Sequence, residues 1–537
     1  MNTKKIYKQE SKKKTPKWFY LVIILLPILL LIILEISLRF FNYGNDYKEW
    51  IDLTERFEIL NPDIANKYFS NIENIPFSSE SFLLKTKPEN SFRVITLGGS
   101  SGAGYPYQNS GSFTKYVRKA LEFSFPEKKI EVANISMAAI NSYTILDLLP
   151  EILEKKPDLI LMYLGHNEYY GVLGAASNQS FASSIFLTNL IIKLKEFRIT
   201  QLLTNFLTSA SQIITTHEKI SDGTLMSQIA KEKLIGLNSP LFNKGLEQFE
   251  SNLSDILELC SDKNVPVIIG TLVSNLRDLK PFNNVDDGKN PKADLIFEKA
   301  QQALVNNDLQ KADSLFRDAK DLDGLRFRAP EIFNSVINNL AVKYNCEIAK
   351  IDSFINSQSK FGIVGNDLIV DHLHPNLKGY QLFGKLFYEK IIKSNKIALG
   401  KSSLNSYSEV EKLVEENFNF TKYDSTIADF RVKLLKNDWP FTTDGNRKDK
   451  SKLLNIADFE DSIALNVLEN KISRLDARLK LAEHYYSLKD LQSYVKELLA
   501  LSEEFPIDNK ILDEASAKLI NAHQYNYVGN ILERSYK

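Results

Sequence analysis

Residues 92–104 read FRVITLGGSSGAG, an apolar, β-branched run followed by a glycine-rich turn with Ser100 at its tip. The run from Val94 to Leu97 predicts a buried strand of a parallel sheet. The glycines permit a turn that holds Ser100 at the strand's carboxyl end, where open α/β sheets bind ligands. The turn lacks the lysine of a phosphate-binding loop and the G-x-G-x-x-G spacing of a dinucleotide-binding loop. Taken alone, it indicates either a nucleophile turn or an ordinary tight turn.

Three later segments add chemistry to the same α/β pattern. Residues 132–139 read VANISMAA, residues 159–168 read LILMYLGHNE, and residues 371–376 read DHLHPN. The first two begin as apolar strands and end in small or polar residues. The third supplies an acid and a histidine three residues apart.

These four segments, in this order, resemble the four sequence blocks of the SGNH/GDSL hydrolases. The resemblance implies an α/β fold, an SGNH-type three-layer α/β/α domain with a parallel sheet, and a serine esterase activity. It implies that Ser100 is the nucleophile. It also implies an oxyanion hole formed by the backbone N–H groups of Ser100 and Ala139 and the side-chain amide of Asn167, where each donor is worth about 10²–10³ in rate.

The chain departs from the commonest family pattern at three positions. Gly99 stands where the residue before the serine is commonly Asp, Ala139 replaces a glycine, and Glu168 replaces an Asp. None of these changes removes a catalytic group, since Ala139 still has a backbone N–H.

The nucleophile needs a base within hydrogen-bond reach, because a serine hydroxyl alone is weakly reactive. His374 is the candidate base, and Asp371 can accept a hydrogen bond from its other ring nitrogen. His372 is a rival, but the Asp-x-x-His spacing favours His374, and His166 is expected to shape the pocket. No histidine pair lies at zinc-ligand spacing beside cysteines, so we expect neither a metal nor a cofactor.

The N-terminus predicts a membrane anchor. Residues 1–17 carry seven lysines and one acid, and residues 18–34 are uninterruptedly apolar, with residues 36–41 extending the span. Glu35 and Arg39 can pair at the membrane interface. The basic flank predicts that residues 1–17 are cytoplasmic and that residue 42 onward lies on the periplasmic or extracellular side of the cytoplasmic membrane. A cleaved signal peptide is the alternative, disfavoured by the long apolar region and the lack of a small-x-small site.

Composition limits the partners. The 537 residues have a net charge of zero, which gives no argument for nucleic-acid binding. The two cysteines, Cys260 and Cys346, are too few for a disulfide scaffold. They could form one bridge in an oxidising compartment, but buried single cysteines are the favoured alternative.

The chain divides into five predicted regions: a basic tail (1–17), a transmembrane helix (18–41), a juxtamembrane segment (42–90), the hydrolase domain (91–397) and a helical region (398–537). About 200 residues separate Asn167 from Asp371, so helical insertions are expected near 187–250 and 290–335. The second insertion and the C-terminal region have a spacing similar to tetratricopeptide helix pairs, with a generic helical bundle as the alternative. The C-terminal region is a candidate surface for a protein partner.

Two arginine-containing segments lie near the predicted core. Arg277 follows a predicted strand at residues 265–272, and Arg328 lies in an aromatic-arginine stretch. Either side chain could bind an acidic group of a substrate. The alternative is structural pairing with Asp278, Asp321 or Asp323.

The sequence therefore predicts a membrane-anchored serine esterase that hydrolyses O-acyl, chiefly O-acetyl, esters of cell-envelope glycans, with an acylated glycan or a lipid ester as its substrate. A lipase, a thioesterase or an acyltransferase of the same fold stays open. A catalytically silent domain that presents helical repeats to envelope partners is the alternative from another class.

Overall fold

The computed structural model describes residues 16–69, 75–76, 81–177, 184–214, 224–230, 234–404, 406–442, 446–505 and 509–535. The chain divides into two compact units, residues 1–47 with 190–219, and residues 48–189 with 220–537. The basic tail predicted at residues 1–17 falls almost wholly outside the described residues.

The first unit contains the apolar helix α1 (Lys17–Phe40) and helix α6 (Arg198–Ile214). Of the described helices, α1 alone is long and apolar enough to cross a membrane, a test that a signal sequence also passes. The Glu35 carboxylate accepts a hydrogen bond from Arg39 Nε at 2.8 Å, so the predicted pairing is present. It also accepts the backbone N–H groups of Arg198 and Ile199, both at 3.0 Å, and so satisfies the N-terminus of α6.

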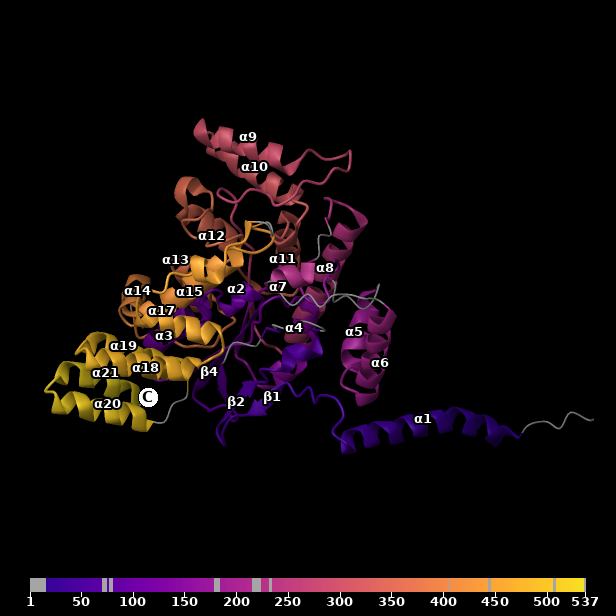
Figure 1. Ribbon diagram of the computed structural model, residues 1–537, viewed down its shortest axis with the longest axis horizontal. Helices are drawn as coiled ribbons and strands as arrows, with labels where there is room; N and C mark the ends of the chain where they lie inside the picture. The colour runs from indigo at the N-terminus through magenta and orange to yellow at the C-terminus, as the bar shows by residue number, and fades with distance from the viewer. Residues whose placement is uncertain are drawn as a thin grey trace, which may run out of the picture. The chain divides into compact units, whose positions relative to one another are not determined.

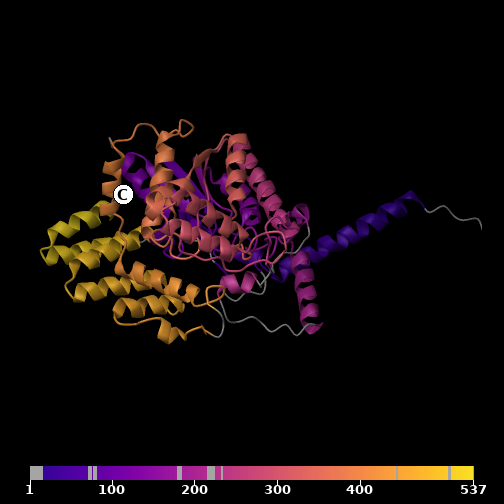
Figure 2. The same cartoon turned by 90° about the horizontal axis from the view of Figure 1, so that it is seen from above.

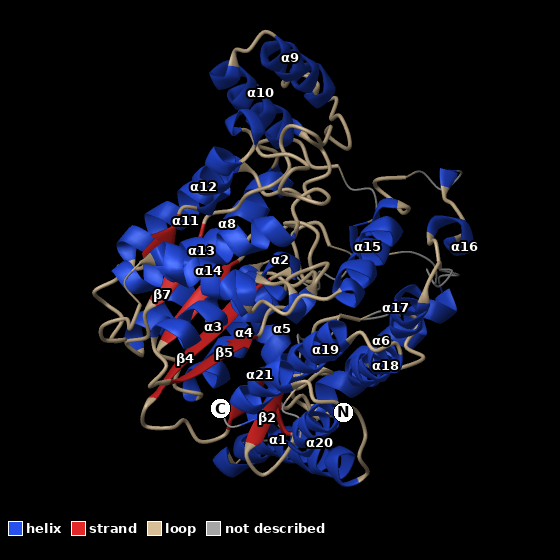
Figure 3. Ribbon diagram, turned by 90° about the vertical axis from the view of Figure 1, so that its left-hand side faces the viewer, coloured by secondary structure: helices blue, strands red, loops and turns tan. Residues whose placement is uncertain are grey.

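The second unit is built on a parallel sheet of five strands in the order β5-β4-β6-β7-β8. Figure 3 shows strands of this sheet, among them β5, β4 and β7, surrounded by helices. The strands are β4 (Ser91–Gly98), β5 (Lys129–Asn134), β6 (Leu159–Tyr163), β7 (Val267–Gly270) and β8 (Glu347–Ala349). The α/β class and the strands expected from the sequence are confirmed. Strands β4, β6 and β7 are almost entirely buried, which explains their continuous apolar runs.

Strand order creates a switch point at β4 and β6. The chain moves from β4 to β5 in one direction and then from β5 past β4 to β6 in the other. Right-handed crossovers therefore put the connecting helices α3 (Phe113–Ser124) and α4 (Ser142–Glu154) on opposite faces of the sheet. The crevice at such a switch point, outside the strands' carboxyl ends, is where open α/β sheets bind ligands.

Helices complete the outer layers and the insertions. Helix α13 packs with α3 and α12, whereas α8 packs with α4 and α11. The remaining helices through the sheet region are α2 (Ser100–Ala103), α5 (Ile185–Leu194), α7 (Leu225–Ala230), α8 (Pro240–Asp262), α9 (Ala293–Val305), α10 (Leu309–Leu322), α11 (Glu331–Lys343), α12 (Ile351–Gln358) and α13 (Leu377–Lys393), with 3-10 turns η1 (Ile64–Lys67), η2 (Gln108–Ser110) and η3 (Lys360–Gly362). Helices α9 and α10 form the hairpin expected within the second insertion.

The segment after the apolar helix has structure that the sequence analysis did not anticipate. Strands β1 (Trp50–Asp52), β2 (Phe57–Leu60) and β3 (Phe82–Leu84) form a small antiparallel sheet. Buried Arg93 of β4 donates to the carbonyl of Leu84 at 2.8 Å and pairs with Glu131. The small sheet is therefore fastened to the main sheet.

The C-terminal region is helical, as expected. It comprises α14 (Tyr407–Glu416), α15 (Lys422–Lys436), α16 (Lys450–Leu453), α17 (Phe459–Leu468), α18 (Arg474–Ser487), α19 (Leu491–Glu504), α20 (Asn509–Asn521) and α21 (Tyr525–Ser535). Helices α18 to α21 pack against one another (Figures 1 and 2). The interpretation of these helix pairs as tetratricopeptide repeats stays a prediction.

This region packs on the sheet domain through buried charges. Glu503 of α19 pairs with Lys115 and Lys119 of α3. Burial opposes ionisation of Glu503, but the two lysines outweigh it and lower its pKa to about 2. The ion pairs join the last helices to the first layer of the sheet domain.

Both cysteine thiols are free. Cys260 is buried and Cys346 is half-buried, and burial raises the pKa of both thiols. Of the two alternatives, one disulfide bridge or two single cysteines, the structure shows single cysteines.

Candidate active site

Ser100 lies directly after β4, as the first residue of α2. The turn depends on glycine because of close contacts: a Cβ on Gly98 would lie 2.4 Å from the carbonyl oxygen of Tyr163. A Cβ on Gly99 would lie 2.7 Å from the side-chain nitrogen of Asn167. Glycine at 99 thus lets the Asn167 amide lie against the turn that carries Ser100.

Ser100, His374 and Asp371 form a continuous hydrogen-bonded relay. Ser100 Oγ lies 2.7 Å from Nε2 of His374, and Nδ1 of His374 lies 2.6 Å from Oδ2 of Asp371. The carboxylate accepts from Nδ1, which leaves Nε2 as the acceptor for the serine hydroxyl. The ring of Tyr105 packs on His374 with 4.5 Å between centroids. The structure therefore brings together the three side chains that the sequence proposed as catalytic.

Asp371 is held in its ionised form. Burial would raise its pKa, but His374, His372 and their hydrogen bonds outweigh burial, so the pKa lies well below its usual value. Its Oδ1 also accepts the backbone N–H groups of Leu373 and His374, both at 2.9 Å. A charge fixed in this way can orient the imidazole and stabilise the imidazolium.

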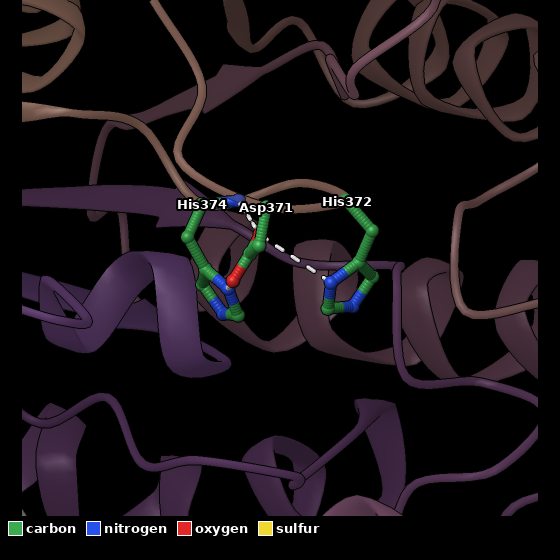
Figure 4. A group of neighbouring side chains, drawn as sticks. All are labelled: Asp371, His372 and His374. Atoms are coloured by element: carbon green, nitrogen blue, oxygen red, sulfur yellow. Dashed lines mark hydrogen bonds and ion pairs between the residues drawn. The ribbon is translucent and has the colours of Figure 1, made fainter. Parts of the chain in front are cut away.

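The other two histidines near the site have different surroundings. His372 Nδ1 lies 3.3 Å from Asp371 Oδ1 (Figure 4). The ring of His372 packs against Phe327 and Phe441. Burial lowers the pKa of His372 and lowers that of His166 further. His166 accepts the N–H of Ala329 at 3.2 Å. In contrast to His374, neither has a hydrogen bond to Ser100 among the described residues.

Asp371, His372 and His374 also place one potential metal-ligand atom each within 4.8 Å of one another (Figure 4). In this arrangement Asp371 and His374 are engaged with each other, and His374 with Ser100. These hydrogen bonds therefore favour a role for Asp371 and His374 in the serine relay over a role as metal ligands.

The predicted oxyanion donors surround the same turn. The side-chain nitrogen of Asn167 donates one N–H to the carbonyl of Ile140 at 2.9 Å. None of the described residues accepts its second N–H, so that donor is available to a substrate. Ala139 has φ of 57°, in the left-handed region that favours glycine, which accounts for the glycine common at this position. Ala139, Asn167 and Ser100 all line one cavity. Their role as oxyanion donors remains a proposal.

Glu168 is a buried anchor behind the oxyanion turn. Its carboxylate accepts from Ser142 N at 2.9 Å, Ser142 Oγ at 2.8 Å and Gln248 Nε2 at 2.9 Å. These contacts join the residue after Asn167 to the first turn of α4 and to α8. Burial nevertheless raises the pKa of Glu168 to about 7.

We expect Glu168 to make stability fall as the pH rises. Between its ordinary pKa of 4.5 and about 7, the folded protein binds more protons at this group than the unfolded chain. Stability is therefore lost through this window, by up to roughly 3 kcal/mol. Glu168→Gln removes the titration and keeps the shape. Between pH 5 and pH 8 the melting temperature of the variant should fall by less than that of the wild type. An equal fall in both proteins would contradict this prediction.

A cavity of about 360 Å³ opens beside Ser100, Asn167 and His374. This volume is in the usual range for small-molecule sites. Its wall is mostly apolar and comes from several distant segments, with main contributions from Tyr105, Leu225, Met226, Phe327, Leu434 and Leu435.

Arg277 and Arg328 lie outside the set of residues that line this cavity. Arg277 pairs with Asp278 at 2.9 Å and Asp367 at 2.6 Å, and Arg328 pairs with Asp323 at 3.0 Å. Arg328 also donates to the carbonyls of Asn275 and Leu279. The structural pairing given as the alternative is the arrangement observed.

The C-terminal region contributes cavity residues that were not predicted from the sequence. Arg431, Leu434 and Leu435 of α15 line the cavity, and Tyr105 donates from its hydroxyl to the carbonyl of Arg431 at 3.0 Å. No motif marks these residues, because the contact joins segments 326 positions apart.

No protein-family model and no curated protein sequence matches the chain. Solved structures similar to it include Axe2, an acetylxylan esterase from Geobacillus stearothermophilus, at 12% identity and a TM-score of 0.31, covering 58% of this chain and 99% of that chain. Another is a putative lipolytic protein of the G-D-S-L family from Desulfitobacterium hafniense DCB-2, at 10% identity and a TM-score of 0.28, covering 56% and 99%. Because both similarities are remote, the chemistry proposed below rests on the site itself.

Proposed function

We propose that this protein is a serine ester hydrolase of SGNH type that acts through an acyl-serine intermediate. The observation that carries the proposal is the relay from Ser100 through His374 to Asp371, at 2.7 and 2.6 Å. The apolar sequence of β4 and the glycine turn after it put the serine where that relay can form.

The geometry supports a two-step reaction. His374 takes the hydroxyl proton as Ser100 Oγ attacks the ester carbonyl, and Asp371 stabilises the imidazolium that forms. The Asn167 amide and the N–H groups of Ser100 and Ala139 would bind the oxyanion. His374 then gives the proton to the leaving alcohol. Water, activated by His374, releases the acid and restores Ser100.

The volume and the apolar wall of the cavity indicate which ester substrates fit it best. An acetyl group would leave most of a 360 Å³ apolar cavity unfilled. Apolar walls reward the burial of further methylene groups by about 0.8 kcal/mol each. We therefore favour esters with acyl groups larger than the acetyl group expected from the sequence, in keeping with the lipase-like or thioesterase-like alternatives.

Fluorophosphonate labelling tests the proposal. The full-length protein should be labelled covalently at Ser100, and a series of 4-nitrophenyl esters should show higher kcat/KM for butanoate to octanoate than for acetate. Ser101→Ala, in the same turn, is the matched control and should still be labelled. Absence of labelling in the folded wild type would overturn the proposal, and a scaffold role would then be the better explanation.

We also propose that α1 anchors the protein, with the hydrolase on the outer side of the cytoplasmic membrane. The lysine-rich stretch before an uninterrupted apolar helix supports this orientation. Alkaline phosphatase, which is active only outside the cytoplasm, should be active when fused after Lys537 and inactive when fused after Lys17. The reverse pattern, in an intact membrane fraction, would contradict the topology. Release of the C-terminal fusion into the soluble fraction would indicate a cleaved signal peptide.

A further inference from the structure

Arg431 brings a positive charge to the wall of the active-site cavity. It lies on α15, and its backbone carbonyl is fixed by the hydroxyl of Tyr105, whose ring packs on the proposed base His374. The guanidinium donates from Nη1 to the carbonyl of Pro106 at 2.7 Å and from Nη2 to Oε1 of Gln108 at 3.2 Å. An arginine has five N–H donors, so these two contacts leave donors for a ligand.

The nearby acids are committed to other cations. Asp424 pairs with Arg478 at 2.6 Å, and Glu504 pairs with Arg478 and with Arg474. Among the described residues no carboxylate forms an ion pair with Arg431, and no other lysine, arginine or acid lines the cavity. Arg431 is in this respect unlike Arg277 and Arg328, which have carboxylate partners.

Arg431 keeps its charge at neutral pH. Burial, followed by repulsion from Arg474, lowers its pKa to about 10, which is still well above neutrality. A partly buried cation without a carboxylate partner is costly, and a bound anion would offset both the desolvation and the repulsion from Arg474. The guanidinium fork suits a carboxylate or a phosphate, which it can bind in bidentate fashion.

We propose that Arg431 binds an anionic group, a carboxylate or phosphate, of the ester that Ser100 attacks. This inference rests on the proposed function and adds the chemical class of the substrate. Leu434 and Leu435 follow Arg431 on the same helix, so one helix supplies both the charge and part of the apolar wall. The substrate is therefore an amphiphilic ester, with an apolar part along α15 and its anion at Arg431.

Two matched pairs of esters test this with full-length protein. In the first, 4-carboxyphenyl and 4-carbamoylphenyl butanoate, the anion is on the alcohol side. In the second, the monophenyl ester of adipic acid and its terminal amide, the anion is on the acyl side. In at least one pair, the wild type should hydrolyse the acid with kcat/KM about 10- to 100-fold above the amide, the size expected for a hydrogen bond to a charged group. Equal rates within both pairs would overturn the proposal.

Variants separate binding from structural support. Arg431→Met keeps the length of the side chain and should abolish the preference, because it should lower kcat/KM for the acid esters at least about tenfold more than for the amide esters. Gln108→Glu gives Arg431 a carboxylate partner without removing it, and should also reduce the preference. Arg431→Lys should retain part of it. If Arg431→Met instead slows acid and amide esters equally, Arg431 only supports the 105–108 turn and the proposal is wrong.

A binding measurement keeps this inference distinct from the proposed hydrolysis. Calorimetry with Ser100→Ala should show tighter binding of the acid than of the amide in one pair, and Arg431→Met added to Ser100→Ala should remove the difference. If this holds while the wild type hydrolyses no ester, the proposed reaction fails and the anion site stands. If the wild type hydrolyses both members of each pair without preference, the reaction stands and the anion site fails.

Discussion

Replacing Ser100 by alanine should reduce ester hydrolysis by roughly 10⁴- to 10⁶-fold, the size of loss seen when a serine hydrolase loses its nucleophile. The reason is that the hydroxyl 2.7 Å from His374 Nε2 is the group placed to attack and to carry the acyl intermediate. The substitution removes one oxygen from a partly exposed side chain, so the melting temperature should change little. Steady-state rates on 4-nitrophenyl butanoate and a thermal melt measure the two effects.

Ser101→Ala is the control for this prediction. Ser101 is buried, and its Oγ has no hydrogen-bond partner among the described residues, so its loss should leave the rate nearly unchanged. Should activity survive in Ser100→Ala and disappear in Ser101→Ala, the nucleophile assignment would be wrong. Residual hydrolysis in Ser100→Ala above the uncatalysed rate would be expected, because oxyanion donors and binding still act without the nucleophile.

The candidate catalytic residues could be predicted because each follows a recognisable local pattern. Ser100 and Asn167 each come three residues after the last apolar residue of a strand-like run, and parallel strands bring their carboxyl ends to one edge of the sheet. Asp371 and His374 are three residues apart, so a single loop sets their mutual geometry. For these residues the local sequence is enough to predict that their side chains lie close together.

The rest of the cavity could not be predicted, since it depends on packing between distant segments. Arg431 reaches the site only because the C-terminal helices fold back on α3 and on the 105–108 turn, through contacts such as those of Glu503 with Lys115. Arg277 was predicted to bind substrate because it follows a strand, and Arg328 because it lies in a stretch that interleaves arginines with an aromatic residue. Both arginines instead form ion pairs with carboxylates. One of the partners of Arg277, Asp367, is 90 residues away from it in the sequence. An arginine's role therefore follows from which acids surround it.

The small sheet β1–β3 was missed for a different reason. Its strands have only three or four residues and too little alternation to give a periodic signal. They are held by tertiary contacts, including the ion pair of Lys155 with Glu58 at 2.7 Å. The formation of such short strands therefore depends on packing against the main sheet domain.

His374→Ala should cost at least about 10³-fold in kcat/KM, since it removes the only described side chain that contacts both Ser100 and Asp371. The hydroxyl then has no base, and Asp371 remains as a buried carboxylate without its main partner. Asp371→Asn should be milder, because the imidazole keeps its contact with the ring of Tyr105. Rates on one small neutral ester would give the order of these two variants.

His372→Ala is the matched comparison, because His372 lies beside the same carboxylate but has no hydrogen bond to Ser100 among the described residues. Its loss removes a ring that packs on His374, with 5.4 Å between centroids, and enlarges the cavity. We therefore expect a loss of no more than about tenfold, expressed mainly in KM, because substrate packing and not proton transfer is affected. Equal losses in kcat at His372 and His374 would mean that Asp371 serves both rings, and the base would then have to be assigned anew.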